Sequence, residues 1–460
     1  MAGTDPEGEC DTGVCDGSGD CAIGNHLWSA RYGDADGQLP LAVAQDEFGN
    51  VVVSGSFMST LNVGAGTMTS AGSSDFFLAR FSSAGVGMVG LKYGDSAAQA
   101  FLKSATGPNG DIYLAGTFTG SVSFGGATLV SAGGFPFGDI AIAKVSTNGN
   151  HQWSDSYGDA SPQVANGLAV DSMGDVVIVG HYSGTLDFGQ PLLSISNNTE
   201  PFVAKLSSSG AYVWANRFGS SMGFESSRAV AVGPDDNIVV VGDFDDTITF
   251  GTTSHVAASA QDAFVVKFDA SGGHQWSRRF GSFGSHTALA VAVDGAGRVA
   301  VALNSDGGVD FGGGDLPSAG GGDVAVALFD PAGNHLWSKK FGDAQADGVA
   351  AVAFDENGNV VLSGSFAGQI DFGAGPLQSA GGVDAFVVKL SATGVPLWAK
   401  RFGDTLDQLG LSVATGPGST IAVTGALQGT MNLGGGALGS SGSPHSRQGG
   451  LCRRSAAGAA

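Results

Sequence analysis

Basic residues are scarce in this sequence of 460 residues. Lysine and arginine together number 20, against 42 aspartate and glutamate residues, which gives a net charge of −22. A chain with this charge repels nucleic acids and anionic membrane surfaces. We therefore expect no nucleic-acid partner. Any partner that is held by charge should be cationic, either a metal ion or a basic protein.

Long apolar runs and helical patterns are also missing. No stretch of 18 apolar residues occurs, so we expect no membrane insertion. No segment keeps its apolar residues at a helical spacing, so helices should be essentially absent. Hydrophobic residues nevertheless make up 42% of the chain, and glycine reaches 78 residues. This composition supplies a large core and many turns, and it argues against a disordered chain.

Cysteine occurs only four times, and three of the four lie near the start, at Cys10, Cys15 and Cys21. Two of them could pair as in a secreted Cys-rich stalk, whereas a zinc site would need CxxC spacing and a fourth ligand nearby. No signal peptide is visible after Met1. We interpret residues 1–24 as a disordered remnant of an extracellular Cys-rich segment that begins further upstream. The expected location is extracellular or at the cell surface.

One unit of about 61 residues is repeated seven times in the chain. An aromatic residue followed by glycine marks each copy, at Tyr32-Gly33, Tyr93-Gly94, Tyr157-Gly158, Phe218-Gly219, Phe280-Gly281, Phe341-Gly342 and Phe402-Gly403. Four residues before the aromatic residue, six copies carry tryptophan: Trp28, Trp153, Trp214, Trp276, Trp337 and Trp398. We expect each tryptophan to lie flat between adjacent units, where its large area stabilises the joint. Val89 takes its place in one copy and should leave that joint looser.

Each unit contains four short runs rich in residues that favour strands. In the sixth copy these are 348–354, 359–366, 384–390 and a run that holds Trp398 and ends at Phe402. Four antiparallel strands repeated seven times predict an all-β fold, a closed seven-bladed β-propeller over residues 25–440. Closure is expected because only a ring leaves no blade face uncovered.

The repeated pattern resembles a known family. Asp-Ala-Phe-Val-Val-Lys-Leu, then Thr-Gly, Leu-Trp, Phe-Gly-Asp, an apolar strand and Gly-Ser-Phe is similar to the bacterial seven-bladed β-propeller repeats called SBBP. The resemblance covers about residues 25–440 and implies a propeller fold in a cell-surface or secreted setting, but that family has no common activity. Residues 389–398 are also similar to the Trp-docking motif of quinoprotein propellers, although quinone-binding residues cannot be placed.

The last unit departs from the pattern. If the tryptophan strand is outermost, residues 26–33 supply the outer strand of the last blade. Counting 61 residues on from Asp384 predicts its third strand at 445, where the chain reads His-Ser-Arg-Gln-Gly-Gly-Leu-Cys-Arg-Arg. We therefore expect a last blade that is closed by the N-terminal strand but incomplete. Residues 441–460 should be a non-repeat tail, either disordered or the product of a reading-frame error.

Aspartate supplies the candidate site residues. One set shares a turn position that other copies fill with Gly-Pro, which favours a turn-forming role: Asp46, Asp171, Asp294 and Asp355. Another set, where the outer strand crosses to the next unit, predicts an acidic rim of Asp34, Asp36, Asp95, Asp159, Asp343, Asp347, Asp404 and Asp407. This rim could hold Ca²⁺ or a basic partner, or its members could be further turn caps. The densest acidic patch, a weak candidate metal site, is Asp235, Asp236, Asp243, Asp245 and Asp246.

No catalytic constellation stands out. The inner strands consist mostly of Ala, Val and Gly, with Lys103 and Arg228 as the exceptions. We therefore expect a non-enzymatic, monomeric surface propeller that binds a protein or a polysaccharide, with Ca²⁺ as the one cofactor to consider. A lyase or hydrolase with its site in the central funnel is the alternative, and a structural spacer in a larger surface protein is the second alternative.

Overall fold

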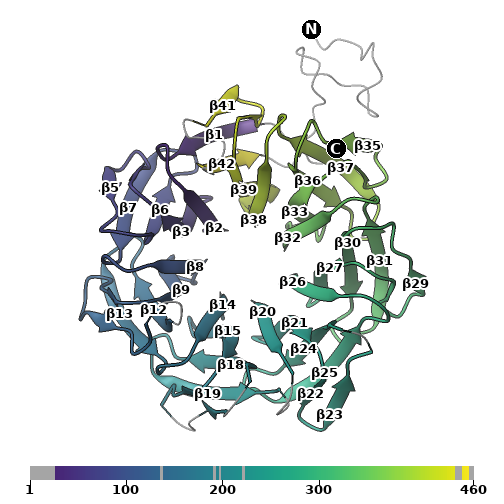
Figure 1. Ribbon diagram of the computed structural model, residues 1–460, viewed down its shortest axis with the longest axis horizontal. Helices are drawn as coiled ribbons and strands as arrows, with labels where there is room; N and C mark the ends of the chain where they lie inside the picture. The colour runs from purple at the N-terminus through teal and green to yellow at the C-terminus, as the bar shows by residue number, and fades with distance from the viewer. Residues whose placement is uncertain are drawn as a thin grey trace.

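The chain folds into a ring of seven four-stranded antiparallel sheets, the blades, around a central axis (Figure 1). The innermost strand of every blade lines a channel along this axis. The computed structural model describes residues 26–134, 138–189, 193–195, 198–219, 223–258, 260–440 and 448–454. Within them, the one helical element is a short 3-10 turn, η1 (Pro417–Ser419). The predicted all-β, seven-bladed propeller is confirmed. The segment 1–24 and its cysteines lie outside the described residues.

Blades one to six each take four consecutive long strands, from the channel outward. Blades one and two consist of β2 (Gln38–Gln45), β3 (Val51–Phe57), β6 (Asp75–Phe81), β7 (Gly87–Tyr93), β8 (Gln99–Thr106), β9 (Ile112–Phe118), β12 (Asp139–Val145) and β13 (His151–Tyr157). Blades three and four consist of β14 (Gln163–Val170), β15 (Val176–Tyr182), β18 (Glu200–Leu206), β19 (Tyr212–Arg217), β20 (Glu225–Val232), β21 (Ile238–Phe244), β24 (Asp262–Phe268) and β25 (His274–Phe280). Blades five and six consist of β26 (His286–Val293), β27 (Val299–Ser305), β30 (Asp323–Phe329), β31 (His335–Phe341), β32 (Asp347–Phe354), β33 (Val360–Phe366), β36 (Asp384–Leu390) and β37 (Pro396–Phe402).

A two-stranded ribbon joins the second and third strands of every blade. The ribbons are β4 (Thr60–Asn62) with β5 (Thr67–Thr69), β10 (Ser121–Val122) with β11 (Leu129–Val130), β16 (Thr185–Leu186) with β17 (Leu193–Ser194), β22 (Thr247–Phe250) with β23 (Thr253–Val256), β28 (Val309–Asp310) with β29 (Asp315–Leu316), β34 (Gln369–Asp371) with β35 (Pro376–Gln378), and β40 (Thr430–Asn432) with β41 (Ala437–Gly439). They lie on the face where each outer strand crosses to the next blade, called here the crossing face. The opposite face carries the hairpin turns between first and second strands and is called the turn face.

Blade seven joins the two ends of the described chain. Its strands, from the channel outward, are β38 (Gln408–Gly416), β39 (Thr420–Leu427), β42 (Gln448–Arg454) and β1 (His26–Tyr32). Figure 1 shows purple β1 beside yellow β42. The expected closure by the N-terminal strand is confirmed, but the expected incompleteness is wrong. Residues 448–454 form the missing third strand because backbone hydrogen bonds to β39 and β1 need no particular side chains. Residues 441–447 and 455–460 lie outside the described residues.

The core lies between blades rather than inside any one of them. Every residue of β36 is buried, as is nearly every residue of β33, because both faces of these strands meet a neighbouring blade. One core cluster, for example, packs Val326 and Leu328 of blade five against Phe386 and Val388 of blade six. A blade therefore completes its core only when both neighbours are present, as the repeat predicts.

Two kinds of contact tie each blade to the next. Near the turn face, tryptophans dock on a glycine of the following blade, as Trp337 does on Gly394, and the indole N–H of Trp337 donates to the carbonyl of Ala392 at 3.0 Å. Near the crossing face, Phe341 of the aromatic-glycine pair packs on Phe372 of the next ribbon, with ring centroids 4.9 Å apart. Glycine is needed at 394 because a Cβ there would meet the indole at 2.8 Å. The looser joint expected at Val89 stays a prediction.

Candidate functional site

The acidic rim lies on the crossing face, as predicted, but most of its carboxylates hold the ribbons in place. Asp159 is typical: it accepts hydrogen bonds from the backbone N–H and the hydroxyl of Thr185 at 2.8 and 2.6 Å, and from the side chain of Gln163 at 2.9 Å. Burial alone would raise the pKa of Asp159, but these bonds outweigh it and lower the pKa to about 2. Equivalent ribbon bonds are made by Asp34, Asp95, Asp343 and Asp404.

The other three rim residues differ from this pattern. Asp36 is exposed and accepts a hydrogen bond from the hydroxyl of Ser59, and Asp407 accepts one from the backbone N–H of Val383 at 3.2 Å. Asp347 is buried, and one of its oxygens accepts the backbone N–H of Asp343 at 3.0 Å. Burial raises the pKa of Asp347 to about 7, helped by the nearby carboxylates of Asp343 and Asp323. The rim thus supplies turn caps around the ring rather than one convergent site.

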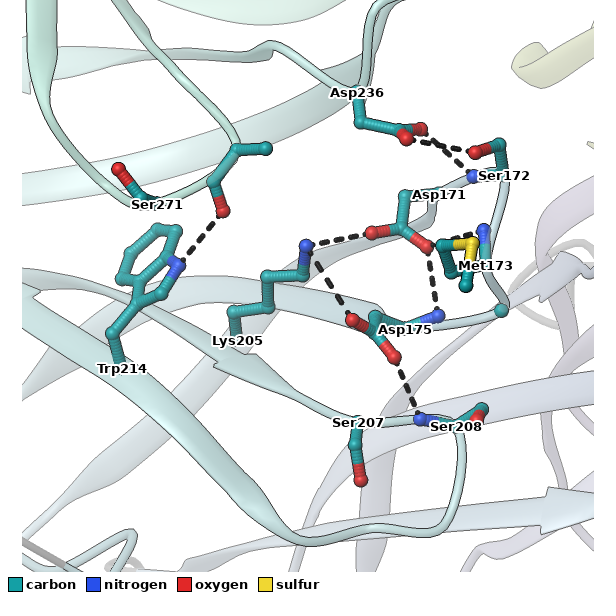
Figure 2. A network of polar contacts seen from close by, with 12 residues as sticks. Asp171, Ser172, Met173, Asp175, Lys205, Ser207, Ser208, Trp214, Asp236 and Ser271 are labelled. Carbon is teal, nitrogen blue, oxygen red and sulfur yellow. Dashed lines mark hydrogen bonds and ion pairs between the residues drawn. The ribbon is translucent and has the colours of Figure 1, made fainter.

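The turn-position aspartates lie on the turn face. Asp46, Asp171 and Asp355 pair with basic residues of the third strand, whereas Asp294 pairs with Arg298 of its own turn. Figure 2 shows the arrangement in blade three, where the ammonium of Lys205 lies 2.7 Å from Asp171 and 3.5 Å from Asp175. Asp171 also caps its own turn by accepting the backbone N–H groups of Met173 and Asp175 at 2.9 and 2.8 Å. Matching ion pairs join Asp46 to Arg80 and Asp355 to Lys389. These carboxylates are engaged by turns and ion pairs, in agreement with the structural interpretation.

The five aspartates of the acidic patch in blade four do not meet. Asp235 and Asp236 precede β21 on the turn face, whereas Asp245 and Asp246 follow it on the crossing face, about 20 Å away for a seven-residue strand. Asp236 accepts two bonds from Ser172 of blade three, as Figure 2 shows. Across the described part of the chain, no group of three or more histidine, cysteine, aspartate or glutamate residues is placed to hold a metal ion. Calcium binding stays a prediction.

A concavity of about 890 Å³ lies at the turn-face mouth of the channel. We call it the basin. Its wall comes from the hairpin turns of blades one, five, six and seven, and it includes the exposed carboxylates of Glu47 and Glu356. Phe48, next to Glu47, is 72% exposed. Arg298 is the one basic residue of this wall, and it is paired with Asp294 at 2.6 Å. The basin therefore presents net negative charge beside an apolar side chain.

Below the basin, the channel narrows to a cavity of about 190 Å³ that every inner strand lines. We call this part the waist. Each inner strand has a β-bulge here, which interrupts its register with the second strand. Most waist residues are Gly, Ala, Val or Leu, but three adjacent blades contribute Lys103, Asn166 and Arg228. The waist thus has its charged and amide side chains on blades two to four, which form its polar wall, and a wall on the remaining blades that is apolar apart from Ser412.

A hydrogen-bond network supports the polar wall. The side-chain amide of Asn166 donates to the carbonyl of Ser227 at 2.9 Å and contacts Nδ1 of His181 at 3.2 Å. The same nitrogen of His181 lies 3.0 Å from the hydroxyl of Ser226. Burial lowers the pKa of His181 to about 4, with a smaller contribution from Arg228, so the ring is neutral at pH 7. The sequence singled out Lys103 and Arg228 but could not show that they line one cavity with Asn166.

Comparisons with known proteins assign this chain no family and no activity. No family model matches the chain. A stretch is 28% identical to an uncharacterized WD repeat-containing protein of Acanthamoeba polyphaga mimivirus, over 28% of this chain and 10% of that protein. The chain therefore spans about a tenth of the length of that relative.

Solved propellers are similar to most of the chain at low identity. Hydrazine synthase of Kuenenia stuttgartiensis is 11% identical with a TM-score of 0.49, over 85% of this chain and 94% of that one. The Pan2 WD40 domain of Neurospora crassa is 9% identical with a TM-score of 0.46, over 96% and 98%. An ulvan lyase is 10% identical with a TM-score of 0.48, over 86% and 93%. At these identities, the similarity is one of fold alone. No helix in the described residues is long and apolar enough to cross a membrane.

Proposed function

We propose that this chain is a non-enzymatic, monomeric β-propeller of the SBBP type that works outside the cell or at its surface and binds a protein partner in the basin. The basin carries the proposal, because at about 890 Å³ it is several times larger than the waist and lies at the mouth of the channel. Its exposed carboxylates and the net charge of −22 favour a partner segment rich in lysine or arginine. Phe48 offers that segment an apolar contact.

A basic segment suits this surface better than a polysaccharide does. The acidic residues that are buried in the turns, such as Asp46 and Asp355, are already ion-paired, so Glu47 and Glu356 remain to meet incoming charge. Charge complementarity of this kind speeds association and is weakened by salt. The lyase or hydrolase alternative and the spacer alternative stay predictions, and neither is part of this proposal.

The test measures binding of a synthetic lysine-rich peptide by fluorescence anisotropy at low and high salt. The double variant Glu47→Gln, Glu356→Gln should weaken binding about tenfold and flatten its dependence on salt. The control variant Asp235→Asn, Asp315→Asn removes the same charge outside the basin and should bind like the native chain. Equal weakening by both variants would reduce the effect to net charge. Binding of a polysaccharide from a glycan array, with no binding of the peptide, would replace the proposal with the carbohydrate alternative.

A further inference from the structure

Residues that hold this propeller together recur from blade to blade, whereas the polar residues of the waist do not. The docking tryptophan is present in six of the seven repeats, and the ribbon aspartate recurs in five. At the bulge of the inner strand, four other blades have an apolar residue: Leu41, Leu289, Ala350 and Leu411. Blades three and four have Asn166 and Arg228 there. Polar residues that the repeat does not require, set on the wall of a cavity, are candidates for binding a ligand.

Lys103 is a cation without an anion. Its ammonium makes one polar contact among the described residues, a hydrogen bond of 3.3 Å to the carbonyl of Leu41. By contrast, the buried Lys205 and Lys389 each pair with an aspartate at 2.7 Å. Burial lowers the pKa of Lys103, because its charged form has lost water without gaining a carboxylate. An anion that entered the waist would supply the missing charge.

Arg228, on the same wall, is held in a fixed position. Its Nε donates to one oxygen of Asp243 at 2.6 Å, and its Nη2 contacts the other at 3.3 Å. Asp243 is fully buried and also accepts the side-chain amide of Gln261 at 2.5 Å, so it is held in place. These bonds fix the guanidinium while Nη1 stays available on a side chain that is 30% exposed. With Lys103 added, the three charges leave a net charge of +1 at this wall.

The largely apolar wall opposite Lys103 and Arg228 indicates that the rest of the ligand is apolar. Leu289, Ala350 and Leu411 face the same cavity from blades five to seven with apolar side chains, and Ser412 is the one polar residue among the waist residues of these blades. A cavity of about 190 Å³ admits a small molecule and excludes a folded chain. The basin lies two residues further along the inner strands of blades one, five, six and seven, on the turn-face side of the waist. Because Asp243 already occupies Nε and Nη2 of Arg228, the ligand meets Nη1 and the ammonium of Lys103, two donors that the two oxygens of one carboxylate can accept from.

We propose that the waist binds a small monocarboxylate, with its carboxylate between Lys103 and Arg228 and its short apolar body against Leu289 and Leu411. One negative charge balances the net charge of the polar wall. The bound carboxylate takes hydrogen bonds from the ammonium of Lys103 and from Nη1 of Arg228, while Asn166 closes the wall between them. This site is separate from the basin surface that contacts a protein partner, so either can exist without the other.

The test titrates the full chain with butyrate by calorimetry, with butyramide as the neutral match of the same shape and inorganic phosphate as a tetrahedral anion. We expect butyrate to bind and butyramide not to bind. Lys103→Met and Arg228→Met should each weaken butyrate binding tenfold or more. Lys339→Met, on the exposed surface of blade five, is the matched control and should bind like the native chain. Binding of the peptide used for the basin should not change in any of these variants.

A second measurement needs no variant and guards against misfolding. Lysine-selective NMR should show that saturating butyrate raises the pKa of Lys103, because a carboxylate beside the ammonium favours its charged form. The proposal fails if butyrate and butyramide behave alike, or if the Lys103 signal does not respond to butyrate. It also fails if Lys103→Met lowers the melting temperature but leaves butyrate binding intact, since Lys103 would then only tether blade two to Leu41. Preference for phosphate over butyrate would reject the carboxylate assignment.

Discussion

Blades six and seven have the same four-strand plan but fill it with different residues. The third strand of blade six reads Asp-Ala-Phe-Val-Val-Lys-Leu, and that of blade seven reads Gln-Gly-Gly-Leu-Cys-Arg-Arg. In blade six, Phe386 fills the space toward blade five, and in blade seven Gly450 stands at the same position. Small apolar voids of about 30 and 20 Å³ accordingly lie on the two sides of blade seven. Backbone pairing thus completes a blade whose side chains pack poorly.

At the crossing face the comparison is reversed. Blade seven begins with Gln408, which donates to Asp404 at 2.8 Å and to the carbonyl of Gln428 at 2.6 Å. Blade six begins with Asp347 at the same position, where a buried carboxylate faces Asp343 and Asp323 instead. Blade seven therefore has the weaker core and blade six the weaker junction. The weak points of this ring therefore lie at single positions and do not belong to one blade as a whole.

The largest effect should come from removing β42. A chain that ends at residue 447 leaves the edges of β39 and β1 unpaired. It also removes Cys452 of β42 and so uncovers the core residues that pack against it, Trp398 and Phe402 among them. The ring therefore cannot close. We expect loss of the cooperative melt or a fall in melting temperature of more than about 10 °C, measured by circular dichroism. A chain that ends at Arg454 keeps all of β42 and serves as the control. Equal melting of the two chains would show that blade seven closes without this strand.

Much of this architecture could be predicted from sequence, because its elements repeat. The spacing of the aromatic-glycine pairs located the blades, and the tryptophans were expected between blades, where Trp337 docks on Gly394. Strand β42 was missed because it shares no side-chain pattern with β36 and starts at 448, three residues later than constant spacing requires. A closing strand forms because the strands on both sides of it offer unpaired backbone N–H and C=O groups. The side-chain pattern of the closing segment itself does not show these groups.

The candidate sites were harder to predict for a physical reason. Aspartates such as Asp159 recur at one position of the repeat and so suggested an acidic binding rim. They recur because each ribbon needs the same cap. Lys103 and Arg228 stood out as polar residues on apolar strands, but they come from different blades. Only the closed ring brings them to one waist. The basin was also unexpected, since the acidic rim predicted a binding surface on the crossing face and the basin lies on the turn face.

The next effect in size concerns the junction of blade six. Burial raises the pKa of Asp347 to about 7 from 3.8, so between these pH values the folded chain holds a proton that the unfolded chain has released. This contribution to stability is fully present below about pH 4 and is lost as the pH rises to 7. Asp347→Gln removes the titrating group and gives blade six the glutamine that blade seven has at this position, Gln408. We expect it to stabilise the ring by about 1 kcal/mol at pH 8, and by much less at pH 5.

Thermal melts at both pH values check this prediction, and the reverse change supplies its control. Gln408→Asp should lower the melting temperature of the native ring at pH 8 and have a smaller effect at pH 5, because it places a second buried carboxylate beside Asp404 and Asp384. If Asp347→Gln gave the same gain at both pH values, the benefit would come from its hydrogen bonds and not from the lost charge.

The smallest effect should come from filling the core of blade seven. Gly450 lies in an extended strand, and a Cβ there would meet only the flexible end of Leu427, at 3.3 Å. Gly450→Ala fills part of the void toward blade six and restricts the unfolded chain, so we expect a gain of about 0.5 to 1 kcal/mol. Denaturant melts measure the gain. Gly449→Ala is the matched change toward blade one, where a Cβ meets the ring of Pro40 at 3.3 Å, and it should gain less. If Gly450→Ala destabilised the chain, then blade seven would be packed as tightly as blade six, and the contrast between them would rest on the junction alone.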